Sequence, residues 1–191
     1  MQNTTIGSGV QSVQELVREH RTWFLAFAIS GIVVRLIFVF RLMVITPDSL
    51  VYGDLASNWI RHHVYGLSGP DGPMVVDTRL PGYPAYLAVC FLIAGIDHYR
   101  AACIGQVAVD LATCFVIAKL ALRIAGERAA RWAFALTALC PFFINYTSTA
   151  LTETWTIFFT AVALLFAVEG AEEFESPTLA KAARVGHPKS G

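Results

Sequence analysis

The sequence predicts an all-α integral membrane protein with four full transmembrane helices, one short hydrophobic hairpin and an amphipathic surface helix in its first outer loop. Two observations predict this class. Apolar side chains make up 55% of the 191 residues and charged ones only 15%, against about 45–50% and about 25% in soluble domains. Apolar stretches also cover more than half of the chain, and they span residues 23–45, 81–96, 101–122, 129–150 and 154–171.

Charge and cysteine usage narrow the range of functions. The 14 Lys and Arg balance the 14 Asp and Glu, so the formal net charge is zero. Because nucleic-acid-binding proteins carry a basic field, no nucleic-acid partner is expected. The cysteines lack the CxxC spacing of a metal site and lie inside apolar stretches, which favours a packing role. They are Cys90, Cys103, Cys114 and Cys140.

The first apolar run, 23–45, is expected to be an uncleaved membrane anchor. Its 23 residues exceed the apolar core of about 7–15 residues in a signal peptide. Residues 1–22 are polar, and Arg18 and Arg21 precede the run. Since basic residues stay on the cytoplasmic side, the N-terminal segment is predicted to be cytoplasmic.

A basic cluster orients the middle of the chain. It consists of Lys119, Arg123, Arg128 and Arg131 around Gly126, and a short basic turn of this kind is expected in the cytoplasm. If 81–96 crossed the membrane as well as 101–122, that turn would lie outside. The 16 residues of 81–96 fall short of the roughly 20 that a spanning helix needs. A hydrophobic hairpin that dips into the membrane or lies at its surface is therefore predicted, with five full spans as the alternative.

The last two apolar runs complete the predicted membrane region, 23–171. The run 129–150 is expected to return outward with a kink at Pro141, which removes one helical hydrogen bond. The run 154–171 then re-enters the cytoplasm. The polar tail, 172–191, is predicted to be disordered.

The polar segment 46–80 is expected to lie outside the membrane. Thr46 can cap a helix, Pro47 suits the first helical position, and an acidic Asp48 complements the helix dipole. Apolar side chains recur every four residues at Val51, Leu55 and Trp59. This row predicts an amphipathic helix over 48–63 that lies flat on the membrane surface.

Two charges fall near the middle of apolar runs, Arg35 and Asp110. An isolated charge at that depth costs several kcal/mol. We therefore expect the two side chains to pair, which packs the first span against 101–122. Gln106, one turn away, is expected to add a polar contact.

The outer segment carries a further turn and a cation. Pro70 to Pro73 predict the turn, and Arg79 follows just before 81–96. Taken together, three motifs resemble the N-terminal part of polyprenyl-phosphate-dependent GT-C membrane glycosyltransferases of the protein O-mannosyltransferase, aminoarabinose transferase and RgtA-like type. The motifs are Asp48-x3-Tyr52-x3-Ala56-x-Asn58, then Arg79-x-Pro81-Gly82-Tyr83-Pro84, and Leu151-Thr152-Glu153 after Pro141. The resemblance covers residues 23–170, whereas family members are usually much longer, so this chain resembles their front part only.

The resemblance implies sugar transfer from a polyprenyl-phosphate donor to an acceptor at the outer face of a bacterial inner (plasma) membrane. Asp48 matches the catalytic aspartate, a general base on the acceptor hydroxyl. Arg79 matches the cation that faces the donor phosphate, whose developing charge it would stabilise. Relatives often have Asp-Glu where this chain has Asp48-Ser49, so the second carboxylate is sought at Asp77 or Glu153. Glu153 matches an acidic residue near the mouth of the site.

The same resemblance implies the partners of the chain. These are the lipid-linked sugar donor, membrane lipids and a partner chain that completes the fold. Tyr52 and Tyr83 are the tyrosines of the two outer motifs and are candidate substrate-binding residues. A lipid-facing groove for the polyprenyl tail is expected at an aromatic entrance formed by Trp59, Tyr65, Tyr83 and Tyr86. No cofactor is identified, and a divalent metal is left open. Adjacent His62 and His63 diverge on a helix and do not favour a metal site.

Simpler interpretations stand beside these. Asp48 is also typical of a helix start, Arg79 of an anchor to lipid headgroups, and Glu153 of a helix cap. The alternative function is a non-catalytic small helical membrane scaffold or transporter subunit whose loop 46–80 binds a partner. The enzyme hypothesis requires Asp48, Arg79 and Glu153 to converge on one outer cavity, and the scaffold hypothesis does not.

Overall fold

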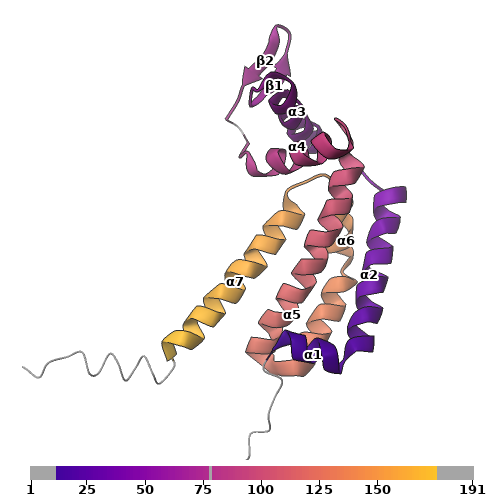
Figure 1. The fold of residues 1–191 in the computed structure, drawn as a ribbon, viewed down its shortest axis with the longest axis vertical. Coiled ribbons are helices and arrows are strands. Elements are labelled where there is room, and N and C mark those ends of the chain that lie inside the picture. Colours follow the sequence, from indigo (N-terminus) through magenta and orange to yellow (C-terminus); the bar gives the residue numbers. More distant parts are fainter. Residues whose placement is uncertain (1–11, 78, 176–191) are drawn as a thin grey trace, which may run out of the picture.

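The computed structural model describes residues 12–77 and 79–175 and is mostly helical (Figure 1). The long helices form a bundle. At one end, which we call the loop end, lie α3, the two strands and α4. At the other, the turn end, α1 crosses the bundle. The elements are α1 (Val13–Glu19), α2 (Arg21–Arg41), α3 (Pro47–His62), β1 (Gly66–Gly69), β2 (Gly72–Val75), α4 (Gly82–Ala94), α5 (Tyr99–Ala138), α6 (Pro141–Thr147) and α7 (Glu153–Glu175).

Within the described part of the chain, three helices are long and apolar enough to cross a membrane. They are Arg21–Arg41, Tyr99–Ala138 and the Glu153–Glu172 portion of α7. Their apolar side chains point largely outward, as lipid-facing helices require. The chain therefore has the character of a multi-pass membrane protein.

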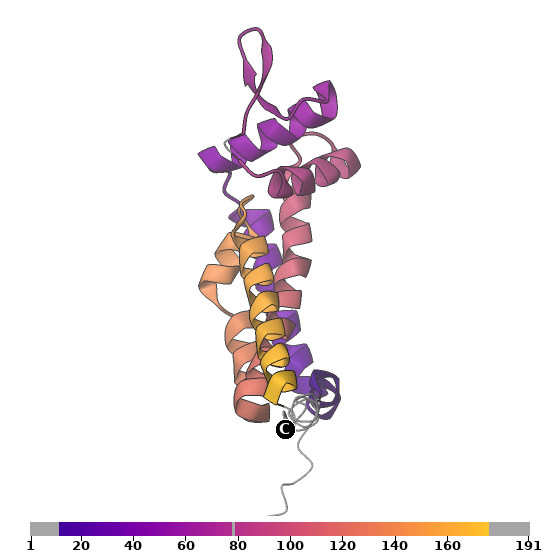
Figure 2. The same ribbon diagram turned by 90° about the vertical axis from the view of Figure 1, so that its left-hand side faces the viewer.

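α5 is a helical hairpin rather than one straight rod. Gly126 interrupts it with φ 80° and ψ −175°, a left-handed conformation that glycine adopts without steric cost. The rings of Phe115 and Phe134 lie 4.8 Å apart, although a straight helix would separate these residues by roughly 28 Å. The chain thus reverses at Gly126, and its second arm returns beside the first (Figure 2).

The prediction of a hairpin at 81–96 is wrong, because the structure has the helix α4 there. The segment forms a single helix of 13 residues, because nothing between Pro84 and Gly95 favours a reversal. At a rise of 1.5 Å per residue the helix is about 20 Å long, too short to cross a bilayer core of about 30 Å. It lies across the end of the bundle (Figure 1), with Tyr83, Leu87 and Phe91 buried.

α3 begins as predicted. Thr46 is the N-cap, its hydroxyl accepts a hydrogen bond from the Ser49 backbone N–H at 3.2 Å, and Pro47 opens the helix. Its packing differs from the prediction, because the helix lies against α4 with a face of mainly small residues. Of the expected apolar row, Leu55 is fully buried, whereas Trp59 is 37% exposed.

A β-hairpin follows α3 where only a turn was predicted. β1 and β2 pair antiparallel from Gly66 opposite Val75 to Gly69 opposite Gly72. Asp54 anchors the hairpin to α3: its carboxylate accepts bonds from the Ser68 backbone N–H at 2.7 Å and from the Ser68 hydroxyl at 2.6 Å. Asp54 is therefore occupied by a structural role.

Both ends of the chain also differ from expectation. α1 forms inside the predicted polar segment, with a Ser12–Glu15 capping box and a fully buried Leu16. α7 continues to Glu175 rather than ending at residue 171. The rest of the predicted disordered tail, 176–191, lies outside the described residues.

The intramembrane pair is confirmed. Arg35 forms an ion pair with Asp110, and its Nε donates to Asp110 Oδ2 at 2.5 Å. Its Nη1 donates to the Ala138 carbonyl at 2.6 Å, and both charged side chains are only 2% exposed. The pair joins α2 to both arms of α5.

The expected role of Gln106 beside that pair is wrong. Its Oε1 accepts a hydrogen bond from the Tyr83 hydroxyl at 2.7 Å, and its Nε2 donates to the Thr149 carbonyl at 2.9 Å. An amide can accept and donate at once, so the buried Gln106 ties α4 to the chain between α6 and α7. It positions the loop end instead of the Arg35–Asp110 pair.

Candidate functional site

Asp48 and Arg79 form an ion pair at the loop end. Arg79 Nη2 lies 3.0 Å from Asp48 Oδ1. The side chain of Arg79 is 41% exposed and that of Asp48 is 59% exposed. Asp48 lies in the first turn of α3, and Arg79 lies between β2 and α4. An exposed pair of this kind contributes about 0–1 kcal/mol. A ligand can therefore replace either partner at little cost.

Two tyrosines pack next to Arg79: Tyr52 contacts the guanidinium, and Tyr83 contacts Tyr52. The guanidinium carbon of Arg79 lies 5.9 Å from the centroid of the Tyr52 ring, within cation–π range. The Tyr52 ring in turn meets the Tyr83 ring edge to face at 5.2 Å. Arg79 is thus held between a carboxylate and an aromatic face. The structure brings four of the predicted site residues together: Asp48, Tyr52, Arg79 and Tyr83.

Tyr83 is the buried centre of this group. Burial raises the pKa of its hydroxyl well above the usual range, and nearby side chains, the Glu153 carboxylate among them, raise it further. The hydroxyl therefore stays protonated and donates its hydrogen bond to Gln106. The ring of Tyr86, which neighbours Tyr83, contacts that of Trp155, so the start of α7 lies near these tyrosines.

Glu153 begins α7 together with an unusual set of polar atoms. Glu153 Oε2, Thr154 Oγ1 and Trp155 Nε1 are buried and have no hydrogen-bond partner within the described residues. Leaving such an atom unpaired costs about 1–3 kcal/mol. Of the three residues, Trp155 lines a cavity, where water or a ligand can satisfy its indole N–H.

A cavity of about 480 Å³ opens between the start of α4 and the start of α7. The Tyr86 and Trp155 rings form part of its wall and contact each other edge to face, 5.0 Å apart. Its size falls within the range of small-molecule sites, and its mainly aromatic wall with a few polar groups is typical of them. Its lining residues are Leu80, Gly82, Tyr83, Tyr86, Thr152, Trp155, Thr156 and Phe159.

The predicted aromatic entrance is divided between two places. Tyr83 and Tyr86 line the α4–α7 cavity, but Trp59 lines a separate groove of about 400 Å³ between α3 and α4. Tyr65 stacks edge-on against Trp59 at 5.3 Å, and its hydroxyl donates to the Arg79 carbonyl at 2.8 Å. The entrance as predicted is therefore wrong, because α4 separates its members.

The other predicted carboxylate, Asp77, is exposed on the segment after β2. The ion pair of Asp48 in the described part of the chain is with Arg79. Sequence reasoning missed Trp155 and Phe159, whose rings stack 5.9 Å apart beside the cavity. Their only signal was their position at the head of an apolar run, where aromatic residues are common.

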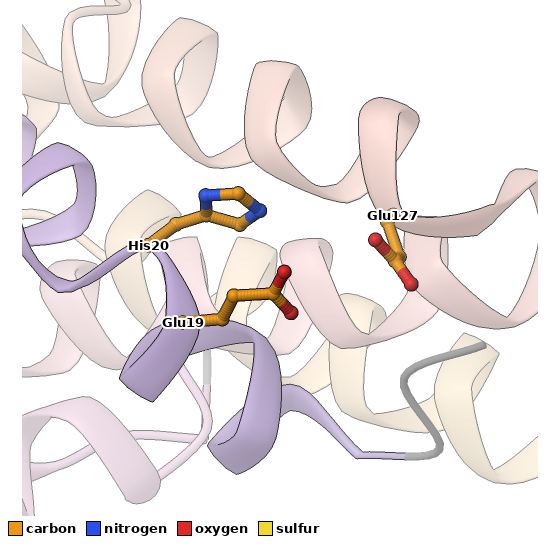
Figure 3. Close-up of side chains that lie close together, drawn as sticks. All are labelled: Glu19, His20 and Glu127. Carbon is orange, nitrogen blue, oxygen red and sulfur yellow. The ribbon is translucent and has the colours of Figure 1, made fainter. Parts of the chain in front are cut away.

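Metal-ligating side chains gather elsewhere. Glu19, His20 and Glu127 lie close together (Figure 3). They are at the turn end, opposite the end that carries α3 and α4 (Figure 1).

Comparisons of this chain with protein-family models, with curated proteins and with solved structures found no match.

Proposed function

We propose that this chain is a GT-C glycosyltransferase, or the front part of one, that transfers a sugar from a polyprenyl-phosphate donor to an acceptor hydroxyl at the outer face of the membrane. The observation that carries the proposal is the exposed Asp48–Arg79 ion pair. Arg79 packs on Tyr52, and Tyr52 packs on Tyr83, which lines the aromatic cavity. This combination supplies a base, a phosphate-binding cation and a lipid-compatible wall.

The chemistry follows from those residue types. The acceptor oxygen forms a bond to the anomeric carbon of the sugar, and the bond from that carbon to the phosphate oxygen breaks. Arg79 exchanges its contact with Asp48 for the departing phosphate, whose negative charge it stabilises. Asp48, released from its partner, accepts the proton of the acceptor hydroxyl.

The cavity can also hold the isoprenoid chain and the sugar of the donor. Tyr86, Trp155 and Phe159 offer aromatic surface to an isoprenoid chain. The indole N–H of Trp155, which lines the cavity, can bond to a sugar hydroxyl. Glu153 does not line the cavity, and we propose it as a neighbouring substrate-binding residue and not as a base.

The proposed orientation places this site outside the cell. The chain crosses four times, through α2, through each arm of α5 with α6 extending the second, and through α7. The basic turn at Gly126 and the N-terminal segment lie in the cytoplasm of a bacterial cell. The loop end, with α4 at the membrane surface, then faces outward.

The test is donor turnover by the purified chain in vesicles that contain polyprenyl-phosphate sugars. Asp48→Asn is expected to lower turnover by about 10²–10⁴-fold, the usual contribution of a general base. Asp71→Asn, in the exposed turn of the β-hairpin, is the matched control and should leave turnover unchanged. Unchanged turnover in Asp48→Asn would refute the role of the base.

A second candidate is a non-catalytic scaffold or transporter subunit. Apolar side chains on the outer segment favour it: Met74, Val75 and Leu80 are 58%, 81% and 86% exposed. Exposed apolar patches often mark interaction sites. In that case Arg79→Ala would leave binding of a polyprenyl phosphate unchanged, whereas the enzyme proposal expects this variant to weaken it.

A further inference from the structure

The turn end of the bundle carries a second group of chemically active side chains. Glu19 is the last residue of α1, His20 joins α1 to α2, and Glu127 directly follows the reversal at Gly126. One ligand atom from each of the three residues lies within 4.8 Å of the others. Figure 3 shows both carboxylates beside the His20 ring.

The fold places these residues together through well-packed elements. Leu16 is fully buried in the core that the two arms of α5 form with α2, and this docks α1 on the bundle. Gly126, with its positive φ, reverses the chain and starts the second arm at Glu127. The three side chains therefore converge from two segments far apart in the sequence, each held by its own packing.

The His20 ring lies between Arg131 and Glu127. Its Nδ1 lies 3.5 Å from Nη1 of Arg131, and its other ring nitrogen, Nε2, faces Glu127 (Figure 3). Because a guanidinium only donates, this long contact uses the lone pair of Nδ1 and leaves the proton on Nε2. A metal bound at Nε2 would therefore move that proton to Nδ1 and break the Arg131 contact. His20 and Glu127 are half-buried, and Glu19 is exposed, so the group is partly shielded and remains open to entry from water.

We propose that Glu19, His20 and Glu127 bind a divalent transition-metal ion of the zinc class. Two carboxylates balance the charge of the ion, and one imidazole distinguishes it from Mg²⁺ and Ca²⁺, which prefer oxygen ligands alone. Bonds of about 2.0–2.2 Å place tetrahedral ligands roughly 3.4 Å apart. Rotation of the two glutamate side chains closes the difference from 4.8 Å, and water completes the coordination.

Such an ion would link the α1–α2 junction to the turn of α5. Because it binds the folded chain and not the unfolded one, it would raise the melting temperature, and the rise would grow with the logarithm of its concentration above the dissociation constant. This role is independent of the proposed glycosyl transfer, since the loop-end site lies at the opposite end of the bundle (Figure 1).

The experiment is a Co²⁺ titration of the full chain, purified in detergent and stripped with EDTA. We expect one Co²⁺ per chain, visible absorption bands of an ion with nitrogen and oxygen ligands, displacement by Zn²⁺ but not by Mg²⁺, and a higher melting temperature. His20→Gln and Glu127→Gln should each weaken binding by at least about tenfold. His62→Gln, an exposed imidazole at the end of α3, is the matched control and should bind as the parent chain does.

Glu19→Gln keeps the test decisive if a variant at the junction or the turn fails to fold. Glu19 is exposed, so this variant should unfold at the parent temperature in EDTA and still lose Co²⁺ affinity. The proposal is overturned if the parent chain shows no saturable binding of one ion, if His20→Gln binds Co²⁺ like the parent, or if His62→Gln abolishes binding.

Discussion

At the scale of single residues, the buried ion pair of Arg35 and Asp110 organises the interior of the bundle. The Arg35 guanidinium meets Asp110 and also the carbonyls of Gly31 and Ala138. The pair was predictable because the chain offers few partners for a cation at that depth. The role of Gln106 was not, since an amide can bond to any nearby carbonyl, and the end of α6 and the chain after it supply several.

Breaking this pair from one side should be far more harmful than removing both charges. Asp110→Asn leaves the Arg35 charge buried without its counter-ion, and we expect it to lower the free energy of unfolding by about 3–5 kcal/mol. The double variant Arg35→Met with Asp110→Leu should regain most of that loss. Denaturant unfolding in detergent micelles measures both. A double variant that is no more stable than Asp110→Asn would contradict this expectation.

At the scale of elements, local sequence signals predict some helices and strands, whereas others form only through tertiary packing. The start of α3 was predictable from Thr46 and Pro47, because a cap and a fixed φ act locally. The β-hairpin and α1 were not, since each is short and is held by tertiary contacts such as Asp54 with Ser68 and the burial of Leu16. The divided aromatic entrance was equally hidden, because only the position of α4 separates Trp59 from Tyr83.

The contact of α3 with α5 depends on the absence of a side chain at Gly53. A Cβ there would lie 1.7 Å from the Tyr99 hydroxyl oxygen, so Gly53→Ala must push α3 or Tyr99 aside. Overpacking of this kind typically costs about 1–3 kcal/mol, and we expect a lower melting temperature. Gly82→Ala is the control, because its Cβ would meet nothing within 4 Å. Equal melting temperatures for the two variants would contradict the close approach of α3.

At the scale of the whole molecule, the orientation in the membrane decides which site meets which compartment. The reversal at Gly126 and the short α4 are observed, and with them four crossings put the β-hairpin and the Gly126 turn on opposite sides. Five crossings would put them on the same side. The basic turn and the short apolar run left both four and five crossings open in the sequence. The short α4, which lies across the end of the bundle, favours four.

Labelling of single cysteines in intact cells tests this arrangement. In a background with the native cysteines replaced by alanine, Asp71→Cys in the exposed β-turn and Arg128→Cys beside the Gly126 turn both present exposed thiols. A membrane-impermeant maleimide should label Asp71→Cys in intact cells and Arg128→Cys only after permeabilisation. Labelling of both without permeabilisation would support five crossings and move the Glu19, His20 and Glu127 group out of its proposed compartment. Labelling of neither would place the Asp48–Arg79 pair in the cytoplasm, where the proposed outer-face transfer could not occur.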